Sequence, residues 1–251
     1  MLHNYHTHTF RCNHAKGTER EYVESAIQNG LKTLGFSDHA PYLFENTSYY
    51  SDHRMRVDEL QEYAQTVREL AKEYAGDIRV LLGFELEYYP DFHNGEMAFL
   101  QTVSPDYLIL GQHFLHNELD FLPSRIARPN GLSTYVTQVL AGLATGDFLY
   151  LAHPDLAGFD YPPEVIEREY TRLCEGAKRM GIPLEINLLG VREKKHYPSE
   201  TFFAIAAKVG NEVVLGFDSH SPGSLGSKES ERGGLDIVDK FGLKLITTPL
   251  L

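Results

Sequence analysis

The sequence predicts an α/β fold in which a parallel sheet closes, or nearly closes, into a barrel with helices outside. Short apolar runs alternate with helical patterns along the 251 residues, and this alternation is typical of parallel strands joined by helices. Residues of metal-binding type stand at the end of nearly every apolar run. An open sheet gathers its ligands at one switch point, whereas a barrel brings every strand's carboxyl end to one face, so the pattern favours a barrel.

Seven strands are expected, because seven runs are short, apolar and separated by helical or turn-forming stretches. In chain order they cover about 2–7, 33–37, 78–86, 107–112, 148–152, 183–188 and 213–217. No linker rich in Pro, Gly or Ser divides the chain. Residues 1–251 are therefore expected to form a single domain.

Three helices have clear signals, over about 18–30, 57–75 and 163–180. The first opens on Thr18 and Glu21, a capping box in which each side chain satisfies the other residue's free backbone amide. In the second, apolar residues recur every three or four positions and form one stripe. Gly76 and Gly181 follow the second and third helices, where glycine is a common stop signal.

Composition narrows the class of protein. The formal net charge of -12 argues against a nucleic-acid partner, because phosphate backbones are bound by clustered Lys and Arg. Cys12 and Cys174 lie far apart, which fits a reducing compartment. No secretion signal is evident, and no apolar stretch approaches the ~20 residues that cross a bilayer. A cytoplasmic protein without a membrane partner is expected.

Nine residues in short blocks at the strand ends predict a multinuclear metal site. They are His6, His8, His14, His39, Glu85, His113, His153, Asp218 and His220. Neutral imidazole is the commonest metal ligand, and residues two apart on a strand point the same way, so His6 and His8 can reach one ion. A lone histidine at a strand end is more often a hydrogen-bonded residue. Only the whole set supports the metal site.

Glu85 is the expected bridge between ions, because a carboxylate has two oxygens that accept independently. Glu87, two residues on, shares the same face of the strand and is the alternative. Glu85 is preferred because it lies closer to the predicted strand end. Arg192 follows the sixth strand, where a guanidinium could bind phosphate oxygens in a bidentate manner; a surface salt bridge is its alternative role.

In their order, these blocks resemble the polymerase and histidinol phosphatase (PHP) superfamily, and within it the histidinol-phosphate phosphatase branch. The motifs are His6-Thr7-His8-Thr9 with His14, Ser37-Asp38-His39, Gly83-Phe84-Glu85-Leu86-Glu87-Tyr88 and Gly216-Phe217-Asp218-Ser219-His220-Ser221-Pro222. They span residue 3 to about 226. The resemblance implies a distorted (β/α)7 barrel of the TIM-like PHP type, forming one metallophosphoesterase domain over 1–251.

The resemblance also implies two or three divalent transition metals: zinc, manganese or iron. His6, His8, Glu85 and Asp218 would hold one ion; His14, His39 and His220 a second; and Glu85, His113 and His153 a third. The mixed nitrogen and oxygen ligands do not select one metal.

The implied activity is metal-dependent hydrolysis of a small phosphorylated metabolite, with histidinol phosphate, an intermediate of histidine biosynthesis, as the leading substrate. Asp218, His220 and Arg192 are the expected catalytic residues, and Arg192 also the expected phosphate contact. The family's second basic residue after the fifth-strand histidine is missing from residues 154–159, and Arg125 or Arg128 could substitute for it. The alternatives are another small phosphomonoester, a barrel metallohydrolase of another type such as an amidase, or a non-catalytic metal-binding protein.

Overall fold

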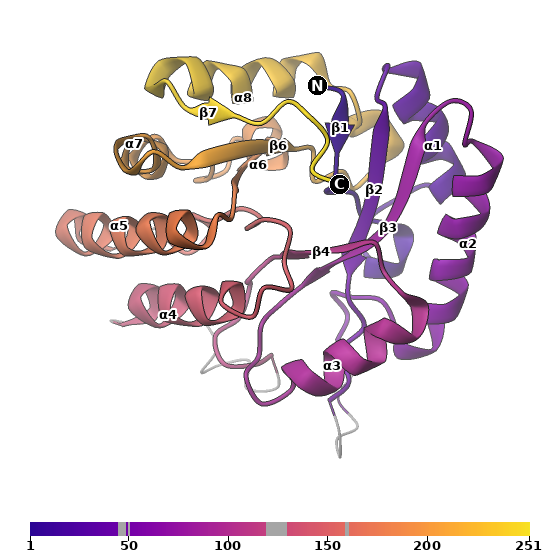
Figure 1. Ribbon diagram of the computed structural model, residues 1–251, viewed down its shortest axis with the longest axis horizontal. Helices are drawn as coiled ribbons and strands as arrows, with labels where there is room; N and C mark the ends of the chain where they lie inside the picture. The colour runs from indigo at the N-terminus through magenta and orange to yellow at the C-terminus, as the bar shows by residue number, and fades with distance from the viewer. Residues whose placement is uncertain (45–48, 50, 119–129, 159–160) are drawn as a thin grey trace.

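The computed structural model describes the chain except residues 45–48, 50, 119–129 and 159–160. Its strands and helices alternate along most of the chain (Figure 1). They are β1 (His3–Asn4), α1 (Glu19–Gln28), β2 (Thr33–His39), α2 (Leu60–Glu73), β3 (Arg79–Leu86), α3 (His93–Leu100), β4 (Tyr107–Leu110), α4 (Gly131–Leu143), α5 (Pro163–Met180), β5 (Leu184–Asn187), α6 (Leu188–Glu193), α7 (Glu200–Val209), β6 (Glu212–Gly216), α8 (Lys228–Phe241) and β7 (Lys244–Leu245).

The strands form two parallel groups that bridging residues join into one curled sheet. One group has the order β1-β2-β3-β4 and the other β5-β6-β7. Leu151 bridges to Leu110 of β4 and to Leu184 of β5, and Thr7 bridges to Ser219. The last bridge joins the chain after β1 to the chain after β6, next to the predicted ligands. The helices lie outside this sheet, with α1 and α2 on one side and α4, α5, α7 and α8 on the other (Figure 1).

The expected strand over 2–7 is shortened to β1, and two further differences from the expected strands need correction. The expected strand over 148–152 is reduced to the single bridging residue Leu151, although its backbone still bonds to both neighbours: Ala152 N–H donates to Leu110 O at 2.9 Å and Leu151 N–H to Pro183 O at 3.1 Å. The two-residue strand β7 was not expected, because so short a pairing leaves no apolar run to detect.

The three helix predictions are confirmed, within a few residues at the ends. Thr18 and Glu21 form the predicted capping box before α1. The pattern over 57–75 becomes α2, preceded by a short 3₁₀ turn. Gly181 ends α5 with a φ of 69°, in the left-handed region that suits glycine. No helix in the described ranges is both long and apolar enough to span a membrane.

Aromatic side chains fill the barrel interior below the carboxyl ends of the strands. Tyr107 is buried there, and its hydroxyl donates to the backbone oxygens of Tyr5 at 2.8 Å and Phe36 at 3.0 Å. A Cβ on Gly35 or Gly83 would lie 2.2 or 2.5 Å from atoms of this ring. Glycine at these positions therefore makes room for the tyrosine.

One buried carboxyl outside the pocket should give the fold a pH dependence. Glu96 of α3 is buried, and its Oε2 accepts from the backbone N–H of Leu43 at 3.0 Å. Burial raises the pKa of Glu96 from 4.5 to about 7. Because the folded pKa lies above the unfolded one, the contribution of this group to stability is present below about pH 4.5 and is lost as the pH rises towards 7.

Glu96→Gln should therefore stabilise the protein at pH 8 by on the order of 1–3 kcal/mol, and much less at pH 5. Melting temperatures at the two pH values would measure this difference. The exposed Glu167→Gln serves as the matched control. An equal shift for Glu96→Gln at both pH values would contradict the role of ionisation.

Candidate metal centre

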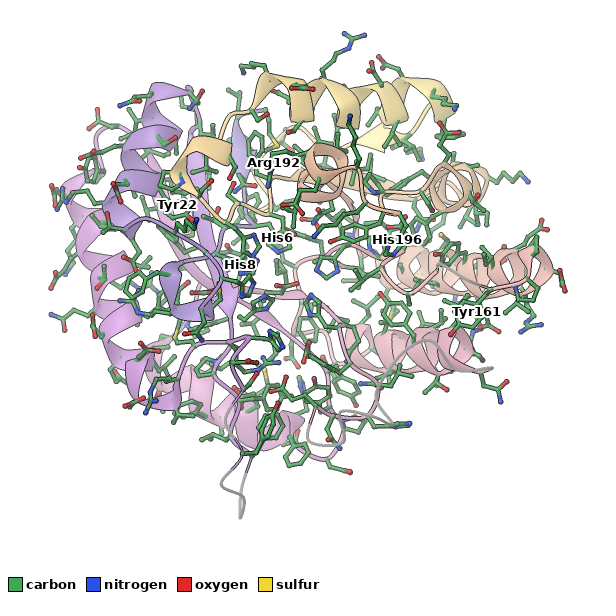
Figure 2. All side chains as sticks on the ribbon, turned by 180° about the vertical axis from the view of Figure 1, so that it is seen from behind. His6, His8, Tyr22, Tyr161, Arg192 and His196 are labelled. Carbon is green, nitrogen blue, oxygen red and sulfur yellow. The ribbon has the colours of Figure 1, made fainter. Side chains whose placement is uncertain are left out.

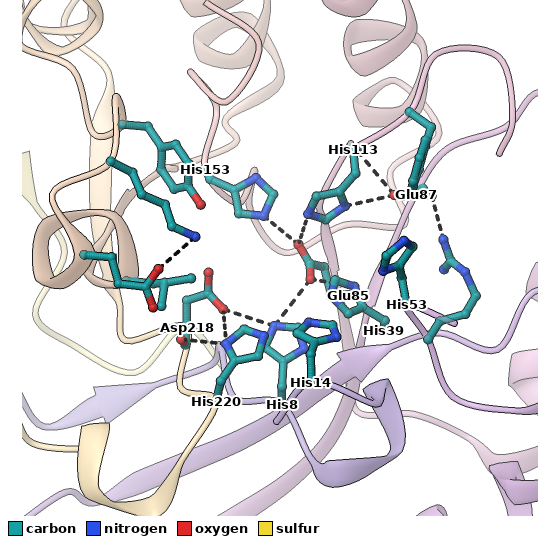
Figure 3. A pocket seen from close by; sticks show the side chains of 16 residues that line it. His8, His14, His39, His53, Glu85, Glu87, His113, His153, Asp218 and His220 are labelled. Carbon is teal, nitrogen blue, oxygen red and sulfur yellow. Dashed lines mark hydrogen bonds and ion pairs between the residues drawn. The ribbon is translucent and has the colours of Figure 1, made fainter. Parts of the chain in front are cut away.

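The nine predicted ligands come together at the carboxyl ends of the strands. Eight of them line a pocket of about 470 Å³, and the ninth, His6, is fully buried beside it. Figure 3 shows the cluster, with the imidazoles grouped around Glu85 and Asp218. His39 and Glu85 lie on β2 and β3, which place them opposite each other in register. The other seven lie in loops that follow a strand or a bridging residue.

Two of these loop residues have unusual backbone conformations. His153 has a φ of 28° and Asp218 a φ of 46°, in the region that residues other than glycine rarely occupy. Each lies at the point where the chain leaves the barrel. Such conformations cost free energy and persist where the surroundings impose them, which is a frequent feature of functional sites.

Glu85 has the geometry of a bridging carboxylate. Its Oε1 lies 2.7 Å from His153 Nε2 and 3.8 Å from His113 Nε2. Its Oε2 faces the other group, 3.0 Å from His39 Nδ1 and 3.5 Å from His8 Nε2. A Cβ on Gly111 would lie 1.8 Å from Oε1, so glycine at 111 leaves the space that this carboxylate occupies.

Asp218 is the second carboxylate that faces the cluster. Its Oδ1 lies 3.1 Å from His8 Nε2 and 3.6 Å from His6 Nε2. Its Oδ2 accepts a hydrogen bond of 3.0 Å from the Asn187 side chain. One oxygen is thus fixed by the protein and the other is directed at the histidines.

The charges of the cluster are mutually dependent. Burial alone would raise the pKa of Glu85, but His39, His113 and His6 together hold it well below its usual range. Burial lowers the pKa of His220 to about 3, with His8 adding to the effect. Both carboxylate and neutral imidazole are metal-binding forms.

The described residues fit divalent metal ions. Five buried atoms in the cluster have no hydrogen-bond partner in the part of the chain that the structure describes: His6 Nε2, His8 Nδ1, Glu85 Oε2, His153 Nδ1 and Asp218 Oδ1. Unpaired buried polar atoms are costly, and their concentration at one place suits the binding of a cation. Several donor triads lie within 4.8 Å, among them His6-His8-Glu85, His6-His153-Asp218 and His8-His39-His220.

The donor triads cross the expected grouping of the ligands: His8 joins His39 and His220, and His153 joins His6 and Asp218. His14 and His220 also form a donor triad with Cys12, which was not among the nine expected ligands. The Cys12 thiol is buried and donates to Thr9 O at 3.1 Å. His14 Nδ1 contacts Cys12 O at 2.6 Å, which leaves Nε2 as the nitrogen able to bind metal.

A second row of polar residues orients the ligands, and sequence reasoning missed its most important member. Glu185 of β5 is fully buried; its Oε1 contacts His6 Nδ1 at 2.7 Å, and its Oε2 accepts from the backbone N–H of His153 at 2.9 Å. Metal-binding histidines commonly donate their other nitrogen to a carboxylate in this way. The sequence did contain one indication of this role: Glu185 is a charged residue inside an apolar run that was expected to be a buried strand.

The pocket has further lining residues besides the proposed ligands. They are Leu189, Glu193, Lys195 and Tyr197, close together in the sequence, and His53, Arg54, Glu87 and Phe114 from other segments. Lys195 Nζ lies 3.0 Å from Glu193 Oε2. Sequence reasoning missed Lys195 and Arg54, since a single basic residue in a loop carries no pattern.

The predicted arginines lie elsewhere. Arg192, labelled in Figure 2, is on α6 between the pocket residues Leu189 and Glu193 but is itself not among the described pocket-lining residues. Its Nη1 is buried without a hydrogen-bond partner in the described part of the chain. Arg125 and Arg128 lie outside the described residues.

Comparisons with known proteins find a matching family and several relatives. A family model for the PHP domain matches residues 4–188. The chain is 32% identical over 236 residues to a probable histidinol-phosphatase of Deinococcus radiodurans, covering 88% of this chain and 87% of that protein. It is 33% identical over 122 residues to the histidinol-phosphatase of Bacillus subtilis, covering 47% of this chain and 46% of the relative.

Two solved structures share the fold. The putative histidinol phosphatase of Listeria monocytogenes has a TM-score of 0.75 at 20% identity, covering 91% of this chain and 99% of that one. The histidinol phosphate phosphatase of Lactococcus lactis, solved with zinc, L-histidinol and phosphate, has a TM-score of 0.73 at 19% identity, covering 98% and 95%. At these identities the likeness shows the fold alone, and it confirms the predicted distorted barrel.

Proposed function

Because the chain belongs to the PHP-domain family, we propose that it is a metal-dependent phosphatase that hydrolyses histidinol phosphate to histidinol and phosphate. The observation that carries the proposal is the position of Glu85, whose two oxygens face two separate groups of histidines. This arrangement suits several ions in one site. Slow phosphate monoester hydrolysis is the kind of reaction for which several metals are useful.

We propose two or three divalent ions per chain, of zinc, manganese or iron. His6, His8, Glu85 and Asp218 would hold one, His14, His39 and His220 a second, and Glu85, His113 and His153 a third. When bound, the metals would supply a water-derived nucleophile at neutral pH and positive charge near the phosphoryl oxygens.

The protein's own side chains would orient the metal ligands and supply positive charge to the substrate phosphate. Asn187 fixes Asp218 through Oδ2, and Glu185 fixes His6 and the backbone of His153. The phosphate would be held by Arg192 of α6, with Lys195, which follows α6 and lines the pocket, as the second cation. Asp218 and His220 lie together, with His220 Nδ1 3.4 Å from Asp218 Oδ1, and remain our candidates for proton transfer at the reacting centre.

The pocket walls support a substrate like histidinol phosphate. Histidinol carries an amine and an imidazole, and the walls present the Glu193 carboxylate and the rings of Phe114 and Tyr197. Lys195 also supplies a cation that the stretch after His153 lacks. The family's basic residue shortly after the fifth-strand histidine is still absent from residues 154–159, and this difference favours a second candidate substrate, another small phosphomonoester. The expected cytoplasmic location, the single domain and the lack of a nucleic-acid partner remain predictions.

The test is a comparison of kcat/KM for histidinol phosphate, glycerol phosphate and phenyl phosphate with metal-loaded protein. Histidinol phosphate should be preferred by at least about 100-fold, because buried polar groups reject substrates that leave them unpaired. Equal turnover of all three would favour the second candidate. No hydrolysis with zinc, manganese or iron would refute the phosphatase assignment.

A further inference from the structure

Arg54 forms a buried network that connects four separate segments of the chain. Its Nη1 donates to Ala40 O at 3.0 Å, in the loop after β2. Nε donates to Glu118 Oε1 at 2.9 Å, and Nη2 donates to Glu118 Oε2 at 2.8 Å. The same Nη2 donates to Glu87 Oε2 at 2.9 Å, just past the end of β3. Arg54, Glu87 and Glu118 are all at least 96% buried.

This network leaves Arg54 little capacity to bind a substrate phosphate, although it lines the pocket. Two buried carboxylates already surround its single positive charge. Four of its five N–H groups have the partners named above. If Arg54 turned towards a substrate, Glu87 and Glu118 would be left as buried, unpaired charges. Arg54 therefore influences the pocket by holding these carboxylates in place.

Glu87, which Arg54 holds in place, in turn fixes the position of His113. Its Oε1 contacts His113 Nδ1 at 2.8 Å and accepts from the His113 backbone N–H at 3.3 Å. Its Oε2 is held by Arg54 and by the hydroxyl of Tyr89. Both oxygens of Glu87 therefore have hydrogen-bond partners, whereas Glu85 Oε2 has none among the described residues and faces His39 and His8.

His113 depends on this contact more than His153, the other histidine of the proposed third ion, depends on its own surroundings. Its side chain is 29% exposed, whereas that of His153 is 3% exposed. Its Nε2 lies 3.8 Å from Glu85 Oε1, compared with 2.7 Å for His153. A proton on Nδ1 facing Glu87 leaves the Nε2 lone pair directed towards Glu85, as a metal ligand requires. Dashed lines mark both contacts of His113 in Figure 3.

We infer that Arg54 and Glu87 form a positioning pair that holds His113 in the orientation needed to bind the third metal ion. Arg54 holds one oxygen of Glu87, and Glu87 fixes the ring and the backbone of His113 with the other. The pair acts on one ligand only, so its loss should affect one ion and not the whole centre. The inference rests on the proposed metal centre but does not depend on the substrate.

Glu87→Gln is the primary test. An amide offers an acceptor on one side only, so the variant must break the contact with either Arg54 or His113. We expect one fewer ion per chain by elemental analysis, or a 10- to 100-fold weaker affinity for the most weakly held ion. Titration of the metal-free protein with cobalt, followed by its visible absorption, should lose one step while the other steps remain.

Glu169→Gln is the matched control, because Glu169 is a buried carboxylate that contacts Arg172 on α5, outside the pocket. It should keep the full metal content. Arg54→Lys keeps the positive charge but loses the guanidinium that contacts Glu87 and Glu118 together. Its affinity for the most weakly held ion should lie between those of wild type and Glu87→Gln. If Arg54→Lys does not fold, the metal content and affinity of Glu87→Gln, compared with those of Glu169→Gln, still test the inference.

Unchanged stoichiometry and affinity in Glu87→Gln would overturn the inference. So would loss of all ions together, since that would show that Glu87 supports the whole centre. Both readouts use metal alone. A protein that shows the expected cobalt titrations but hydrolyses no phosphomonoester would leave this inference standing and refute the proposed function.

Discussion

Replacing Glu85 with glutamine should remove most of the bound metal and lower kcat/KM for phosphomonoesters by at least about 10³-fold. Glu85 faces both groups of histidines, so every ion in the proposed centre except that of His14, His39 and His220 uses it. An amide carries no charge and offers a single acceptor oxygen. Metals supply several kcal/mol of transition-state stabilisation, and each 1.36 kcal/mol changes the rate about tenfold.

The measurement combines elemental analysis with steady-state kinetics after reconstitution with zinc, manganese or iron. Wild type should hold two or three ions. Glu193→Gln is the matched control for metal content, because it makes the same chemical change at an exposed residue of the same pocket. If Glu85→Gln kept its metals while Glu87→Gln lost them all, the bridging role would move to Glu87.

The blocks of histidine and carboxylate could be predicted from the sequence because each rests on local rules. His6 and His8 are two apart just after β1, and Asp218 and His220 repeat this spacing just after β6. Parallel strands place their carboxyl ends on one face, so residues separated by more than 200 positions meet without any pairwise information. The same rules explain why the barrel was predictable while the two-residue strand β7 was not.

The residues that orient the ligands could not be predicted in this way. Arg54 contacts Glu87, 33 residues away, and Glu118, 64 residues away, and no periodicity links the three. Glu185 lies in an expected strand, but its contact with His6 depends on how the barrel closes. Long-range pairs of single residues depend on the final packing of loops, which local spacing does not determine.

Arg192→Ala should lower kcat/KM for the phosphomonoester substrate by about 10- to 150-fold, the loss expected for a charge-assisted contact of about 1.5–3 kcal/mol. Metal content should stay at the wild-type level, because no nitrogen of Arg192 belongs to the proposed ligand set. A comparison of kinetics, metal content and melting temperature separates binding from folding. Arg232→Ala, at an exposed position on α8, is the matched control.

The melting temperature is the decisive readout for Arg192. In a purely structural role, the guanidinium would be paired within the protein, and its loss would destabilise the fold. Instead its Nη1 is buried without a described partner, which costs free energy unless another group, such as a phosphate oxygen, accepts from it. Arg192→Ala should therefore melt no lower than wild type without substrate, while losing any stabilisation that added phosphate confers. A lower melting temperature with unchanged kinetics would assign Arg192 to the fold and leave Lys195 as the phosphate contact to test next.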